Sequence, residues 1–110
     1  MIANHPHAHL DRLNLEMDRR VAAKIRQDPS LVSIARANLQ RWMERDEGFV
    51  HPVHGEWLDI LRFLEPGELA DFIESDTPKA DRLRQSSPFT GILSEAERLA
   101  ILHADEETTV

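Results

Sequence analysis

Residues 9–27, HLDRLNLEMDRRVAAKIRQ, carry an apolar side chain at every third or fourth position. An α-helix has 3.6 residues per turn, so this spacing places the apolar side chains on one helix face that packs against a core. The sequence therefore predicts a long amphipathic helix over residues 9–27. Its apolar stripe consists of Leu10, Leu13, Met17, Val21 and Ile25.

The residues that follow predict a bend and a second helix. Asp28 is a favourable N-cap, and Pro29 suits the first helical position because its missing N–H has no intrahelical partner there. Apolar spacing then continues to about Asp46, and Gly48 ends the pair. We expect these two helices to form an antiparallel or angled hairpin. The second stripe consists of Leu31, Ile34 or Ala35, Leu39 and Trp42.

The rest of the chain predicts short helices. Residues 49–55 contain Pro52 and Gly55, which favour a packed loop. Apolar spacing then predicts a helix over 56–64, a short one around Leu69–Ile73, and a fifth that is capped by Asp76 or Thr77. Ser94 and Glu97 form a capping box that opens a last helix to about His103.

The expected fold class is all-α, because no segment alternates apolar and polar residues over the length of a strand. We expect a long N-terminal helical hairpin followed by a cluster of short helices. Residues 1–8 are predicted to be a flexible leader, residues 9–103 a single helical domain, and residues 104–110 a disordered acidic tail.

Composition narrows the class of protein. A chain of 110 residues is the size of one domain. The absence of cysteine excludes disulfides, thiolate metal sites and thiol nucleophiles, and it fits a reducing cytoplasm. No apolar run approaches the roughly 18 residues of a membrane span. We expect a cytoplasmic protein that does not enter the membrane.

Charge is divided unevenly along the chain. Residues 1–47 hold eight Arg or Lys against seven Asp or Glu, whereas residues 48–110 hold five against thirteen, which together give the net charge of -7. Proteins that bind nucleic acid usually carry a basic stripe that neutralises phosphates. The acidic C-terminal half therefore favours a basic protein partner over DNA or RNA.

Motifs for catalysis are missing from the sequence. It contains no Walker or dinucleotide glycine pattern, no G-x-S-x-G motif, and no Tyr or Cys. We therefore predict that the protein is not an enzyme and has no cofactor. A metal-binding protein is one alternative, through the His-rich leader with His5, His7 and His9, together with the H-x-x-H pair His51 and His54.

A small DNA-binding regulator is a second alternative, because basic residues recur on the first two predicted helices. They are interleaved with acids such as Glu16 and Glu44, as on a solvated helix face. A helix-turn-helix over Leu64–Gln85 would lie in the acidic half. The residues that would contact DNA are Arg19, Arg20, Lys24, Arg36 and Arg41.

The segment Arg82–Arg98, RLRQSSPFTGILSEAER, is the most unusual in the chain. An arginine-bearing helix end, a Ser-Ser-Pro-Phe turn and a capped helix form a compact hook that suits docking on a partner. The alternative is that Phe89 and Leu93 fill the protein's own core, with Pro88 fixing the turn. The candidate partner-binding residues are Arg82, Arg84, Gln85, Ser86, Ser87, Pro88 and Phe89.

The same segment resembles a group of small helical bacterial proteins. The shared features are the helix pair over Val21–Trp42 with Asp28-Pro29 in its break, the Trp57-Leu58 stretch, and Leu83–Arg98. Such proteins look like the small partners of nucleotidyltransferase-like proteins. The resemblance covers about 80 residues and implies an antitoxin or accessory subunit. This chain departs from the group at Leu99-Ala100, where an aromatic residue is expected, and in its His-rich leader.

Overall fold

The computed structural model of the protein describes the backbone of residues 6–108 and the side chains of residues 11–104. All regular structure in this part of the chain is helical, which confirms the all-α class. The elements are α1 (Pro6–Gln27), the 3₁₀ turn η1 (Pro29–Leu31), α2 (Val32–Arg45), α3 (Pro52–Phe63), α4 (Pro66–Ile73), α5 (Pro78–Arg84) and α6 (Glu95–Thr108).

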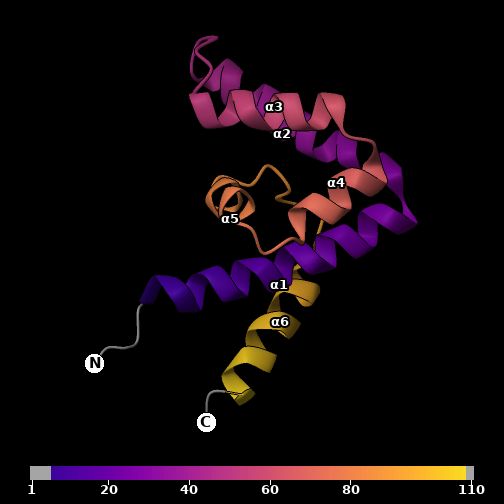
Figure 1. Ribbon diagram of the computed structural model, residues 1–110, viewed down its shortest axis with the longest axis vertical. Helices are drawn as coiled ribbons and strands as arrows, with labels where there is room; N and C mark the ends of the chain where they lie inside the picture. The colour runs from indigo at the N-terminus through magenta and orange to yellow at the C-terminus, as the bar shows by residue number, and fades with distance from the viewer. Residues whose placement is uncertain (1–5, 109–110) are drawn as a thin grey trace.

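Helix α1 is the centre of the fold. Helices α4, α5 and α6 all pack on it, whereas α2 leaves it at an angle and pairs with α3 (Figure 1). The α2–α3 pair and α6 lie at opposite ends of the long axis, which measures 44 Å. Helices α1 and α2 meet at η1, and α2 packs on α3 (Figure 1).

The bend between α1 and α2 forms as its residue types predict. The Asp28 carboxylate accepts a hydrogen bond from the Ser30 N–H at 3.2 Å, and Pro29 begins the 3₁₀ turn. Helix α2 then ends in a turn in which the Gly48 N–H donates to the Met43 carbonyl at 2.8 Å. Gly48 has a φ of 87°, a conformation that glycine adopts without strain.

The core contains most of the apolar residues that the helical spacing selects. Val21, Ile25, Leu39, Trp57 and Leu83 are all buried, and α4 adds Leu69 and Ile73 from its inner face. Trp57 is the largest side chain fully enclosed in the core. The apolar periodicity therefore identified the buried positions of α1 from Val21 onward and the buried faces of α2 to α5.

Three boundaries differ from the prediction. Helix α3 begins at Pro52, so the predicted loop over 49–55 is wrong for Pro52–Gly55, because proline is well suited to the first position of a helix. Phe49 and Val50, which we expected to pack, are exposed. Helix α1 begins at Pro6, inside the predicted leader, and α6 continues through the predicted acidic tail to Thr108.

None of the helices within residues 6–108 has the length and apolar character needed to span a bilayer.

Candidate functional site

The segment between α5 and α6, residues 85–94, is anchored to the core by aromatic packing. Phe89 is 3% exposed and stands edge-on to Trp57, with the ring centroids 5.3 Å apart. Trp57 in turn donates its indole N–H to the Leu83 carbonyl at 3.1 Å. Edge-to-face aromatic pairs of this kind add stability beyond the apolar area that they bury. The packing of Phe89 on Trp57 therefore fixes residues 85–94 on the side that faces the core.

Polar side chains from α1 and α2 hold the same segment by its backbone. The Asn38 amide donates to the carbonyls of Pro88, at 2.7 Å, and Thr90, at 2.9 Å. Lys24 donates to the Ile92 carbonyl at 2.8 Å. Gly91 has a φ of 97°, which allows the chain to turn between these two attachments. Contacts from three helices thus fix the path of residues 85–94.

The structure divides the candidate partner-binding residues into two groups. Arg84, Pro88 and Phe89 are buried, so the alternative in which Phe89 fills the core is the arrangement found. These three side chains are not part of the outer surface in this conformation, and Arg84 and Phe89 face the exterior only through the cavity that they line. The residues that keep accessible surface are Arg82, Gln85, Ser86 and Ser87.

Arg84 is buried because it joins three elements. Its guanidinium donates to Asp81 at 2.5 Å, and to the carbonyls of Ile73, at 2.9 Å, and Ser75, at 2.6 Å. Its remaining hydrogen bond runs from Nε to the Asp18 carboxylate on α1, at 3.3 Å. The side chain thereby ties the end of α4 to α5 and α5 to α1.

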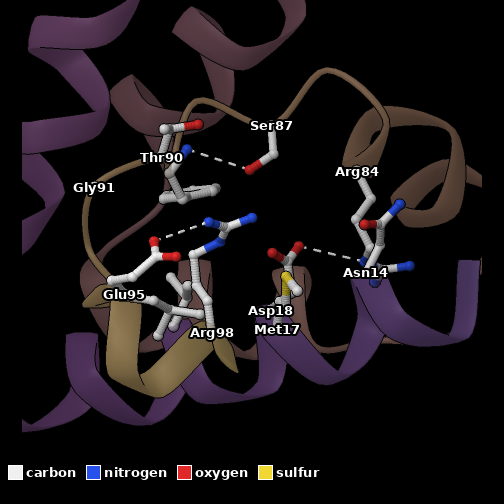
Figure 2. A pocket seen from close by; sticks show the side chains of 12 residues that line it. Asn14, Met17, Asp18, Arg84, Ser87, Thr90, Gly91, Glu95 and Arg98 are labelled. Atoms are coloured by element: carbon white, nitrogen blue, oxygen red, sulfur yellow. Dashed lines mark hydrogen bonds and ion pairs between the residues drawn. The ribbon is translucent and has the colours of Figure 1, made fainter. Parts of the chain in front are cut away.

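A cavity of about 510 Å³ opens above this ion pair, between α1, residues 85–94 and the start of α6. We call it the Asp18 cavity. Figure 2 shows the Asp18 carboxylate pointing into it from α1, with Arg84 on one side and Arg98, from α6, on the other. Its twelve lining residues are Asn14, Met17, Asp18, Val21, Arg84, Ser87, Phe89, Thr90, Gly91, Leu93, Glu95 and Arg98.

The ionisation of Asp18 is strongly affected by its position. The side chain is buried, and burial raises its pKa from 3.8 to about 7 although the charge and hydrogen bond of Arg84 act in the opposite direction. Arg98, the other guanidinium of the cavity, pairs with Glu95 at 3.4 Å and is half exposed. Near neutral pH the cavity thus holds a carboxylate that is easily protonated.

The basic residues that would form a DNA-binding face are mostly engaged within the chain. Lys24 pairs with Glu97 at 2.7 Å, and Arg19 pairs with Glu16. Arg36 donates to the Leu61 carbonyl at 3.2 Å, and Arg41 donates to Asn38. In the helix-turn-helix alternative, Arg84 is buried and Arg82 forms two hydrogen bonds with Glu56.

The histidine pair lies in a different place, where α2 turns into α3. His54 stacks at a tilt on Trp42, with the ring centroids 5.1 Å apart, and His51 pairs with Asp46 at 3.2 Å. Within the described part of the chain, no three His, Cys, Asp or Glu side chains are grouped as metal ligands. The side chains of His5, His7 and His9 lie outside the described residues.

Sequence reasoning missed Asp18 and Asn38, the two buried polar residues that face residues 85–94 or Arg84. A signal for Asp18 was present. Among the side chains of α1 that the structure describes, residues 11–27, the most buried are Asp18, Val21, Ala22 and Ile25, whereas Met17 is only half-buried. Asp18 thus belongs to the same three-to-four spacing as Val21 and Ile25, on the edge of the stripe.

Comparison with models of known protein families gives no match to the chain, and searches of curated proteins and of solved structures give none either.

Proposed function

We propose that the protein is a non-enzymatic interaction module and that the Asp18 cavity receives part of a protein partner. The observation that carries this proposal is which residues form the wall of the cavity. Eight of the twelve lining residues belong to Arg82–Arg98, the stretch that the sequence singles out as a docking hook. The hook then acts through the cavity that it encloses, since Phe89 itself is in the core.

The construction of the cavity supports recognition of a polypeptide. Its walls include apolar side chains, Met17, Val21 and Leu93, next to charged and hydroxyl groups. Small-molecule sites commonly combine an apolar lining with a few placed polar groups, and the same combination suits a side chain that has an apolar stem and a polar end. Because Asn38, Lys24 and Trp57 fix the wall, a partner would bind a surface that is already formed.

The proposed biological role is that of an antitoxin or accessory subunit. It rests on the resemblance of Leu83–Arg98 to small partners of nucleotidyltransferase-like proteins. The excess of acidic residues in positions 48–110 favours a basic partner. Association of this kind needs no catalytic group in the chain.

The test is co-purification from the native host with a variant that fills the cavity. Thr90 lines the cavity, is exposed, and forms no hydrogen bond through its side chain among the described residues, so Thr90→Trp should fold. Ala37→Trp, at an exposed position of α2 outside the cavity lining, is the matched control.

We expect one protein to co-purify in stoichiometric amount with the wild type and with Ala37→Trp, and to be lost with Thr90→Trp at an unchanged melting temperature. Retention of that protein by Thr90→Trp, or recovery of the wild type without a stoichiometric partner, would contradict the proposal.

A further inference from the structure

The charges around Arg84 do not balance within the chain. Arg84 carries one positive charge but contacts two carboxylates, Asp81 at 2.5 Å and Asp18 at 3.3 Å. Asp81 has the shorter contact, and two further guanidinium donors go to the Ile73 and Ser75 carbonyls. Asp18 thus receives the longest of these hydrogen bonds, and one negative charge is in excess.

Of the two carboxylates that share Arg84, the one that lines the cavity is Asp18. Asp18 is 6% exposed, and its carboxylate points into the open space of the Asp18 cavity (Figure 2). Among the described side chains, Arg84 Nε is its only hydrogen-bond donor. A buried carboxylate with one long hydrogen bond is poorly compensated for its lost hydration.

The other charged groups near the cavity are already matched. On α6, Arg98 pairs with Glu95 at 3.4 Å and forms no ion pair with Asp18 within the described part of the chain. On α4, Asp71 and Glu74 both pair with Arg26. Residues 85–94 carry no ionisable side chain. These pairs leave the Asp18 carboxylate with Arg84, which it shares with Asp81, as its sole counter-charge among the described side chains.

We propose that the Asp18 cavity accepts a lysine or arginine side chain of the partner, with its cationic end against the Asp18 carboxylate. The inference rests on the proposed function and names the chemistry of the contact. The aliphatic part of such a side chain would lie along Met17, Val21 and Leu93, while its charged end pairs with the carboxylate. An anionic side chain in the same position would place a second carboxylate against Asp18.

A cationic side chain matches the cavity in charge and in shape. The cavity of about 510 Å³ is large enough for a long side chain, and its apolar walls lead to a single buried carboxylate. Because only ionised Asp18 attracts a cation, binding must weaken as that carboxylate is protonated. The pKa of about 7 that burial produces places this change between pH 8 and pH 6.

The experiment uses the 110-residue chain and a pair of synthetic peptides. The probe is acetyl-Gly-Arg-Gly-amide, and its control is the citrulline peptide, which has nearly the same shape and no charge. Binding is followed by two-dimensional ¹H–¹⁵N NMR up to about 50 mM peptide, a concentration that detects the millimolar affinity expected of a single side chain.

We expect the arginine peptide to shift the amide signals of Asn14, Asp18 and Thr90 at pH 8, and the citrulline peptide to leave them in place. At pH 6 the affinity should be about tenfold weaker, in proportion to the ionised fraction of Asp18. Asp18→Asn should abolish the shifts, whereas Asp76→Asn, the same change at an exposed position, should retain them.

Equal shifts with both peptides, binding by Asp18→Asn at wild-type strength, or no shift at pH 8 would overturn the inference. If Asp18→Asn does not fold, the comparison of the two peptides and of the two pH values in the wild type still decides it. Co-purification separates the two proposals. A partner that is lost with Thr90→Trp but retained by Asp18→Asn would leave the proposed function intact and remove the cationic contact.

Discussion

The Nε atom of Arg84 on α5 lies 3.3 Å from Oδ2 of Asp18 on α1, and both side chains are buried. This contact crosses 66 positions of the sequence and lies beside the cavity that we propose as the binding site. The same guanidinium also binds Asp81 and two carbonyls near the end of α4. The pair therefore links the framework of the fold to the proposed site.

Arg84→Ala should destabilise the protein strongly. The substitution would leave the Asp18 carboxylate and the Ile73 and Ser75 carbonyls without their shared donor. Removal of one partner of a buried ion pair typically costs about 3–5 kcal/mol. Urea unfolding at pH 7 measures the change.

Arg82→Ala is the control, because Arg82 lies on the same helix and pairs with Glu56 at the surface. Exposed pairs contribute about 0–1 kcal/mol, so the loss should be small. Equal losses for the two variants would contradict the structural role assigned to Arg84.

Phe89→Ala should also destabilise the protein, by about 3–5 kcal/mol as for other large aromatic deletions in a core. The ring is enclosed and contacts Trp57, so its removal leaves a cavity at the base of residues 85–94. Thermal unfolding is the measurement. Phe63→Ala, at a side chain that is 73% exposed, should change the melting temperature little, and a large shift there with none for Phe89→Ala would refute the assignment.

Asp18→Asn should change the pH dependence of stability. Burial raises the pKa of Asp18 from 3.8 to about 7 in the folded protein, so from about pH 4 to pH 7 the folded state holds a proton that the unfolded state releases. The contribution of Asp18 to the free energy of unfolding therefore falls as the pH rises from about 4 to about 7. The fall is on the order of 4 kcal/mol, and above about pH 7 the contribution is constant.

Asparagine removes this titration and keeps an oxygen for Arg84. As the pH rises from 5 to 8, the free energy of unfolding of Asp18→Asn should therefore increase relative to that of the wild type. Urea unfolding at several pH values measures this difference. A difference between the two proteins that does not change with pH would show that Asp18 has an ordinary pKa in the folded state.

Glu97→Gln should produce the opposite pH dependence. The hydrogen bond from Lys24 lowers the pKa of Glu97 to about 2, so the ionised side chain stabilises the fold above its unfolded pKa of 4.5. This contribution is lost as pH falls toward 2. The glutamine side chain retains an acceptor for the Ser94 N–H, so the helix cap survives.

We expect Glu97→Gln to be less stable than the wild type at pH 7 and similar to it near pH 2, as measured by thermal unfolding at both values. A difference that is as large at pH 2 as at pH 7 would exclude the ion pair with Lys24 as its cause.

The fold could be predicted from local patterns to a large extent. The spacing from Val21 to Ile25 and the caps at Asp28, Thr77 and Ser94 all correspond to helix faces or ends in the structure. These features depend on residues within one or two turns, which a sequence displays directly. The start of α3 at Pro52 was missed because proline both interrupts and initiates helices.

The candidate site could be predicted only in part. The segment that forms its wall was identified, but the roles of Arg84 and Phe89 within it depend on Asp18 and Trp57, which come from distant helices. Asn38 likewise meets its partners 50 and 52 positions away. Contacts of this range arise from tertiary packing and leave no local pattern in the sequence.

The central claim, that the partner occupies the Asp18 cavity, is tested most directly by chemical protection in the complex. The chain contains no cysteine, so Thr90→Cys and Ala37→Cys each introduce a unique thiol, one at the cavity and one outside its lining. The measurement is the rate of alkylation by iodoacetamide with and without the co-purified partner. We expect the partner to slow the reaction of the thiol at position 90 at least tenfold and to leave that at position 37 unchanged. Equal rates at position 90 in the free protein and in the complex would contradict the account.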